Sequence, residues 1–199
     1  MNILIWGPAR AGKTTLAKKL HDELGHSIVC SDAIIIAFEK SLPQVGIGHS
    51  CSDVAINYVP FITHYLCTLA HNSNMPNGDK FVAVLTHFAI DRAFPKMEEI
   101  LQEMDGLKLH DEFALIGLTY NHKSWKDLRR DIKEYDTEKD WTYRLTNDEL
   151  NNFCKESVER HNKYFAEKFD EYGFMSYDVS YERDKVLNKI VSDMKNQLV

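Results

Sequence analysis

Residues 1–14 read MNILIWGPARAGKT, and this stretch decides the fold. Its spacing is G-x-x-x-x-G-K-T, with Gly7, Gly12, Lys13 and Thr14 at the fixed positions. The run from Asn2 to Trp6 is short, mostly apolar and β-prone, so it predicts a buried strand directly before the glycines.

A helix is predicted directly after the loop, from Lys13 to about Leu24, because apolar residues recur there at helical spacing. Gly25 stands just past its last turn, where a helix commonly ends. The motif therefore has the strand before it and the helix after it that phosphate binding requires.

A loop in this position can bind a polyphosphate. Glycines allow the backbone to approach an anion closely, and the N-terminus of the helix adds partial positive charge. Lys13 is expected to reach the β- and γ-phosphates, and the Thr14 hydroxyl to bind Mg²⁺. The residues expected to contact ATP are Gly7, Ala9, Arg10, Ala11, Gly12, Lys13, Thr14 and Thr15.

The rest of the chain alternates between strand and helix patterns. Further strands are predicted at Ser27–Cys30, Lys80–Thr86, Phe113–Leu118 and Phe174–Val179. Further helices are predicted at Ala33–Lys40, Asp53–Ala70, Phe94–Met104, Asp148–Tyr172 and Glu182–Leu198. Pro60 leaves open whether Asp53–Ala70 is one kinked helix or two. The pattern predicts a single α/β domain over residues 1–199, with a three-layer, doubly wound, mostly parallel five-stranded sheet.

Composition limits the class of protein. The 199 residues are 44% hydrophobic and 27% charged, as in an ordinary globular domain. The net charge of −6 argues against a large non-specific nucleic-acid surface. The four cysteines have no zinc-site spacing, and we see neither a signal peptide nor a membrane-spanning run, so we expect a cytoplasmic protein. The oligomeric state is left open.

Other motifs narrow the kind of nucleotide protein. A GTPase would carry N-K-x-D after a strand, but Asn162-Lys163 is followed by Tyr-Phe within a predicted helix. A motor ATPase would have Asp-Glu at the end of an apolar strand, whereas Asp111-Glu112 precede one. These absences and the short length favour a small phosphotransferase.

The chain resembles the small P-loop kinases related to adenylate, shikimate and nucleoside kinases, in the motif Gly7–Thr14 and in the order of its elements. The resemblance implies an acid at the end of the second strand that binds the acceptor or acts as base, and Asp32 stands there. A carboxylate can orient a hydroxyl and take its proton. The alternative is that Ser31 or Asp32 caps the next helix.

The resemblance also implies an acid near the tip of the third strand that assists Mg²⁺. This sequence departs from that pattern, because the strand ends Leu85-Thr86. Either Thr86 or the later Asp91 could complete the metal shell.

Two further segments have expected roles by resemblance. Residues 121–148 are predicted to form a small lid, with Arg129 and Arg130 as candidate catalytic cations beside Lys13 and Asp32. A solvated helix with internal ion pairs is the alternative for this segment. Residues 33–79 are predicted to form the acceptor-binding insert, and Lys40 is the only lysine or arginine in it. An acceptor phosphate would favour arginines, so an uncharged hydroxyl compound is indicated.

The sequence thus predicts an ATP- and Mg²⁺-dependent kinase that phosphorylates a small hydroxyl-bearing molecule such as a nucleoside, nucleotide or sugar. A kinase resembling the zeta toxins, which act on a nucleotide sugar, is a variant of this reading, and ATP is not distinguished from GTP. The alternative is a nucleotide-binding regulatory or interaction protein with weak or no ATPase activity. No nucleic-acid or membrane partner is expected.

Overall fold

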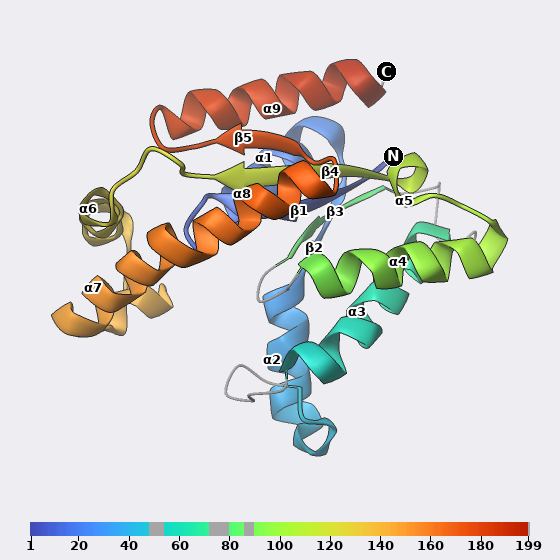
Figure 1. Ribbon diagram of the computed structural model, residues 1–199, viewed down its shortest axis with the longest axis horizontal. Coiled ribbons are helices and arrows are strands. Elements are labelled where there is room, and N and C mark those ends of the chain that lie inside the picture. Colours follow the sequence, from blue (N-terminus) through green and yellow to red (C-terminus); the bar gives the residue numbers. More distant parts are fainter. Residues whose placement is uncertain (48–53, 72–79, 86–89, 199) are drawn as a thin grey trace.

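The computed structural model describes residues 1–47, 54–71, 80–85 and 90–198. Within these residues the chain forms one parallel sheet with helices on both faces (Figure 1). The strands are β1 (Asn2–Trp6), β2 (Ser27–Cys30), β3 (Phe81–Val84), β4 (Phe113–Thr119) and β5 (Met175–Asp178). Their order is β2-β3-β1-β4-β5, and every neighbouring pair is parallel. The predicted fold class is confirmed, and the sheet is wholly parallel.

The described helices are α1 (Lys13–Leu24), α2 (Ser31–Ser41), α3 (Val54–His71), α4 (Ile90–Asp105), α5 (Leu109–Glu112), α6 (Trp125–Tyr135), α7 (Asn147–Glu156), α8 (Asn162–Glu171) and α9 (Arg183–Leu198). Short 3₁₀ turns occupy Pro43–Val45 and Trp141–Arg144. A π-helical turn, Ser157–His161, joins α7 to α8. Among the described residues, no helix has the length and apolar character needed to cross a bilayer.

The central strands β1 and β4 are buried along their whole length. All five residues of β1 and all seven of β4 are buried, since a parallel sheet covered on both faces has no water-facing side. Alternate β1 residues face two different cores. Leu4 and Trp6 pack with α3, α4 and α8, whereas Ile3 and Ile5 pack with α1 and α9. Figure 1 shows α9 and α1 on the opposite side of the sheet from α3 and α4.

Two helices differ from a simple reading of the sequence. Helix α3 is one continuous helix with Pro60 inside it, which answers the question that the sequence left open. The hydroxyl of Thr63 donates to the carbonyls of Val59 (2.7 Å) and Pro60 (3.0 Å), which adds side-chain hydrogen bonds to the turn that contains the proline. The predicted helix Asp148–Tyr172 is interrupted by the π-helical turn, which has one residue more per turn than hydrophobic spacing indicates.

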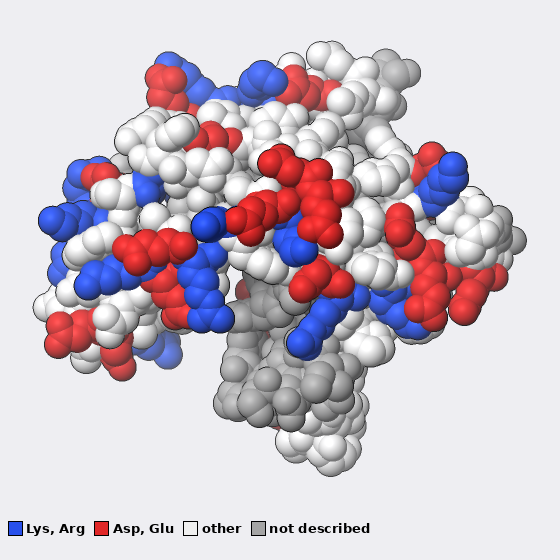
Figure 2. All heavy atoms as spheres, viewed as in Figure 1, with Lys and Arg blue, Asp and Glu red and all other residues white. Residues whose placement is uncertain are grey.

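Side chains of both charge signs are intermingled on the face shown in Figure 2. Several ion pairs of the molecule join residues three or four apart in the chain, such as Arg160 with Glu156 and Lys189 with Asp193. Such exposed pairs contribute little to stability. This face has no broad area of one sign.

Gly117 fixes the distance between β4 and α8. A Cβ atom at this position would lie 2.4 Å from a ring carbon of Phe169, whose side chain is fully buried. We expect Gly117→Ala to lower the free energy of unfolding by roughly 1–3 kcal/mol, because the ring must move within a close-packed core. Urea unfolding measures the change. Ser176→Ala is the matched control, since Ser176 is exposed and pairs with Gly117 in β5; we expect it to change stability by less than about 0.5 kcal/mol. Equal stability of the two variants would contradict this packing.

Candidate active site at the glycine loop

The glycine loop joins β1 to α1 at the carboxyl edge of the sheet. Gly7 has φ 152° and Gly12 has φ 94°, both in the region that favours glycine. A Cβ atom at Gly7 would lie 2.4 Å from the carbonyl oxygen of Leu118, so the loop passes too close to β4 for any side chain there. Gly12 is the N-cap of α1, and its backbone turns the chain into the helix.

Lys13 lies in the floor of this loop. Its side chain is buried, and the ammonium donates hydrogen bonds to the carbonyls of Gly7 (2.7 Å) and Pro8 (2.9 Å). Burial lowers the pKa of Lys13 to about 8, while the nearby charge of Asp32 acts in the opposite direction. Among the described residues, no carboxylate lies within ion-pair distance of the ammonium. A buried cation with only neutral partners is a site that an anion would stabilise.

The other loop residues adjoin Lys13 in the chain. Thr14 and Thr15 are exposed on the first turn of α1, so their hydroxyls are accessible, and Ala11 is buried beneath them. The carbonyl of Ala9 accepts a hydrogen bond from the Tyr120 hydroxyl at 3.3 Å. Oxygen ligands such as a threonine hydroxyl suit Mg²⁺, so the residues present fit a Mg²⁺–polyphosphate.

Asp32 lies in the first turn of α2, close enough to Lys13 for their charges to interact. The N-cap of α2 is Cys30, so neither Ser31 nor Asp32 occupies the capping position. The buried Tyr58 of α3 donates to the carbonyl of Ser31 at 3.0 Å. Burial raises the pKa of Tyr58, and the charge of Asp32 adds to that shift. The structure therefore brings Asp32, Lys13 and Tyr58 together.

The predicted lid segment is built around α6. Leu128 and Ile132 are buried against α7 and the end of β4. Arg129 donates to the side-chain oxygen of Asn147 at 3.1 Å. Arg130 is exposed and pairs with Asp127 (2.8 Å) and Asp131 (3.7 Å) on its own helix. Among the described residues, the polar contacts of both arginines lie on α6 and α7, away from the glycine loop.

Arg10 has a different environment from the one its position in the motif suggests. Its guanidinium pairs with Asp136 and, at 3.0 Å, with Asp140, both in the segment that follows α6. The pairing itself carries no sequence signal, because Arg10 and Asp140 lie 130 residues apart in the chain. This contact is the main feature of the site that the sequence reading missed.

The ends of β4 and β5 meet beside the loop. Asn162 accepts from the backbone N–H of Tyr120 at 2.8 Å and donates to Asn121 at 2.9 Å, which joins α8 to the end of β4. The stem of Arg183 packs against Gly12, because a Cβ atom at Gly12 would lie 3.4 Å from its Cδ. Helix α9 therefore begins next to the loop.

The metal-shell candidates have different outcomes. Thr86 lies outside the described residues. Asp91, at the start of α4, accepts a hydrogen bond from the hydroxyl of Tyr164 on α8 at 2.7 Å. The structure thus places Asp91 at a contact between α4 and α8.

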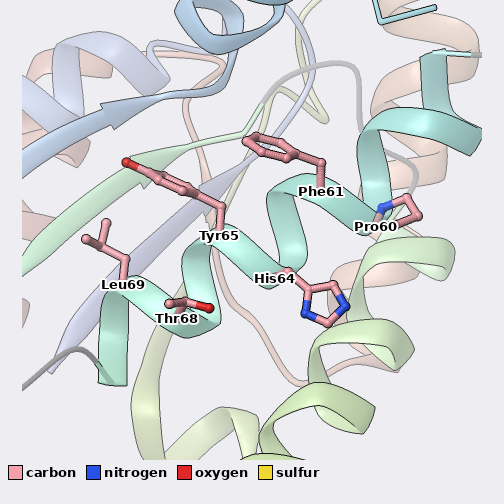
Figure 3. A pocket seen from close by; sticks show the side chains of 6 residues that line it. All are labelled: Pro60, Phe61, His64, Tyr65, Thr68 and Leu69. Carbon is pink, nitrogen blue, oxygen red and sulfur yellow. The ribbon is translucent and has the colours of Figure 1, made fainter. Parts of the chain in front are cut away.

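A hollow of about 590 Å³ lies along α3 (Figure 3). It is lined by Pro60, Phe61, His64, Tyr65, Thr68 and Leu69. In Figure 3, Tyr65 and His64 point to different sides of the helix. Its lining is mostly apolar and shares no residue with the glycine loop.

No protein-family model matches this sequence, and no curated protein matches it. Solved structures do match. A shikimate kinase from Bacteroides thetaiotaomicron has TM-score 0.57 at 16% identity, covering 100% of this chain and 98% of its own. A shikimate kinase from Acinetobacter baumannii, in complex with shikimate, has TM-score 0.55 at 15% identity, with coverages of 100% and 95%. A gluconokinase from Sinorhizobium meliloti 1021 has TM-score 0.54 at 14% identity, with coverages of 98% and 96%.

The chain has the fold of the small P-loop kinases. The resemblance drawn from the motif and the element order is thereby confirmed for the fold. In this P-loop kinase fold the loop, Lys13 and Asp32 all lie at the carboxyl edge of the sheet, where open α/β folds bind their ligands.

The lowered pKa of Lys13 predicts a pH dependence of stability. Between about pH 8 and 10.5 the unfolded chain holds a proton on Lys13 that the folded chain releases. The free energy of unfolding should therefore gain a positive slope with pH in this window. Urea unfolding at pH 7.5, 8.5 and 9.5 measures it as the difference between the wild type and Lys13→Met, which removes the titration.

Lys18→Met is the control for this experiment, because Lys18 is exposed on the same helix. We expect its difference from the wild type to stay constant with pH. A constant difference for Lys13→Met as well would show that the Lys13 ammonium is not desolvated.

Proposed function

We propose that this protein is an ATP- and Mg²⁺-dependent kinase that transfers the γ-phosphate to a hydroxyl of a small molecule. The observation that carries the proposal is the buried Lys13 ammonium, whose hydrogen-bond partners within the described part of the chain are the loop carbonyls of Gly7 and Pro8. The fold supports it, since two of the similar structures are shikimate kinases and a third is a gluconokinase.

Lys13 and the loop amides from Gly7 to Thr15 would bind the phosphates. The ammonium would exchange its carbonyl partners for phosphate oxygens, and such charge-assisted hydrogen bonds are stronger than those to neutral groups. Thr14 would hold Mg²⁺, which when bound draws charge from the phosphate oxygens. The first turn of α1 adds its dipole at the same place.

Asp32 would orient the acceptor hydroxyl and accept its proton late in the transfer. Its position supports this role, because its charge interacts with both Lys13 and Tyr58. A carboxylate beside the phosphate-binding lysine can hold a hydroxyl close to the transferred group. Tyr58 would shape the floor of the acceptor site.

The acceptor is an uncharged hydroxyl compound in this proposal, such as a nucleoside or a sugar. Between residues 33 and 79 the sequence has one lysine and no arginine, so the insert offers few cations to an acceptor phosphate. Its described part instead presents aromatic rings, with Phe38 and Phe61 4.7 Å apart in an edge-to-face contact. A nucleotide or a nucleotide sugar would require cations from other segments.

Residues 121–148 would act as the lid. Lid closure excludes water, which would otherwise compete as the acceptor. Arg129 and Arg130 would leave their present partners on α6 and α7 to approach the transferred phosphate. This role requires the α6 region to move relative to the glycine loop.

One observation favours a second function, that of a nucleotide-binding regulatory protein with weak or no ATPase activity. The third strand ends without an acid, and Asp91 is engaged by Tyr164. A metal shell supplied by Thr14 alone would hold Mg²⁺ weakly.

ADP release in the presence of neutral hydroxyl compounds tests the proposed function. We expect the wild type to phosphorylate at least one nucleoside or sugar, and Lys13→Ala to bind ATP at least about a hundredfold more weakly because it loses a buried cation. Calorimetric titration measures the affinity. Lys18→Ala is the control and should bind ATP normally, since Lys18 is exposed. Unchanged ATP affinity in Lys13→Ala would contradict the assignment, and ATP binding without turnover would favour the regulatory protein.

Asp32→Asn separates positioning of the acceptor from binding of ATP. We expect kcat to fall about a hundredfold or more, as for loss of a general base, with ATP affinity close to that of the wild type. Steady-state kinetics with the best acceptor measures the change. Glu39→Gln on the same helix is the control and should retain turnover. Normal turnover in Asp32→Asn would show that this carboxylate only stabilises the N-terminus of α2 through the helix dipole.

A further inference from the structure

Arg10 combines two unusual features. Its backbone has φ 66°, a left-handed conformation that side-chain-bearing residues rarely adopt. Its guanidinium leaves the glycine loop and pairs with Asp136 and Asp140, in the segment of residues 136–144 that follows α6. Residues in such backbone conformations persist where their surroundings hold them in place.

Asp136 and Asp140 also accept hydrogen bonds from residues of their own segment. The side chain of Asp136 is 2% exposed and also accepts from the hydroxyl of Thr142. Asp140 accepts from the backbone N–H of Thr137 at 3.0 Å and from its hydroxyl at 3.1 Å. These bonds and Arg10 lower the pKa of Asp140. Both carboxylates are therefore fixed in the segment by contacts within it and by Arg10.

We propose that Arg10 is a positioning residue that ties residues 136–144 to the glycine loop and keeps Asp136 as its partner when a nucleotide is bound. The proposal deepens the proposed function, and its nucleotide clause rests on that function. The motif position alone suggests the opposite, that Arg10 moves onto a phosphate.

The burial of Asp136 decides between these two roles. A phosphate would attract Arg10, but the guanidinium would then leave a carboxylate buried without a cation. Removing one partner of a buried pair costs more than the pair itself contributes. Arg10 is also partly solvated, with 25% of its side chain exposed, which weakens any new phosphate contact. The pair with Asp136 is therefore the more stable arrangement.

The tie would have a direct consequence for the lid. It holds the carboxyl end of the predicted lid at the loop, next to the 3₁₀ turn Trp141–Arg144. Closure would then move α6 about this fixed point, with residues 136–144 remaining beside the phosphates.

Hydrogen–deuterium exchange without nucleotide tests the tie independently of any kinase activity. We expect Arg10→Ala, Asp136→Asn and Asp140→Asn each to speed exchange in residues 136–145, by about tenfold for the loss of a charge-assisted hydrogen bond. Arg10→Ala combined with Asp136→Asn should add little to either single change, because both remove the same contact. Exchange in α9 should stay unchanged.

Two variants control for other causes. Arg10→Gly removes the guanidinium together with the backbone conflict, so it should match Arg10→Ala at residues 136–145. Arg160→Ala removes an exposed arginine that pairs with Glu156, and it should leave that segment unchanged. Wild-type exchange in Arg10→Ala, or fast exchange in Arg10→Ala but not in Arg10→Gly, would overturn the tie. If Asp136→Asn fails to fold, Asp140→Asn still measures how removal of a carboxylate that pairs with Arg10 changes exchange in residues 136–145.

ATP titration of the same variants tests the nucleotide clause. We expect Asp136→Asn and Asp140→Asn to bind ATP no more tightly than the wild type. Tighter binding would show that the carboxylates restrain a phosphate ligand, and it would overturn that clause. If the proposed function itself fails, Lys13→Ala and the wild type bind ATP equally, whereas the exchange result still stands.

Discussion

A buried ammonium governs this site. Lys13 has lost most of its water, and its hydrogen bonds go to two backbone carbonyls of its own loop. Those carbonyls offset only part of the desolvation, so the pKa of Lys13 falls to about 8. The loop thus holds a buried cation that an anion would stabilise. Gly7 permits this arrangement, because a Cβ atom there would collide with the Leu118 carbonyl.

The parallel sheet places residues from other elements next to Lys13. Because every strand points the same way, the loop after β1, the start of α2 after β2 and the ends of β4 and β5 share one edge. Asp32 and Tyr58 meet Lys13 there from α2 and α3. Tyr120 and Arg183 brace the loop from the other side, against Ala9 and Gly12.

Local patterns in the sequence predict the local parts of this arrangement. The bounds of β1, α1 and β2 follow from apolar spacing, the Gly7 loop and the helix-ending Gly25, all of which act over a few residues. The pairing of Arg10 with Asp136 cannot be read in this way, because it joins segments distant in the chain. The π-helical turn before Asn162 is equally hidden, since hydrophobic spacing does not show it and the neighbouring contact of Asn162 with the end of β4 joins segments distant in the chain.

The same edge of the sheet bears on where the proposed acceptor would react. The α2–α3 region contains both the hollow along α3 and Asp32, the residue proposed to orient the acceptor. Transfer requires the hydroxyl about 3–3.5 Å from the reacting atom. The hollow shares no residue with the loop, and its lining includes neither Asp32 nor Lys13. In the proposed kinase the reacting hydroxyl would therefore lie beside Asp32, whose charge interacts with Lys13, and the aromatic side chains of α3 would hold the rest of a larger acceptor.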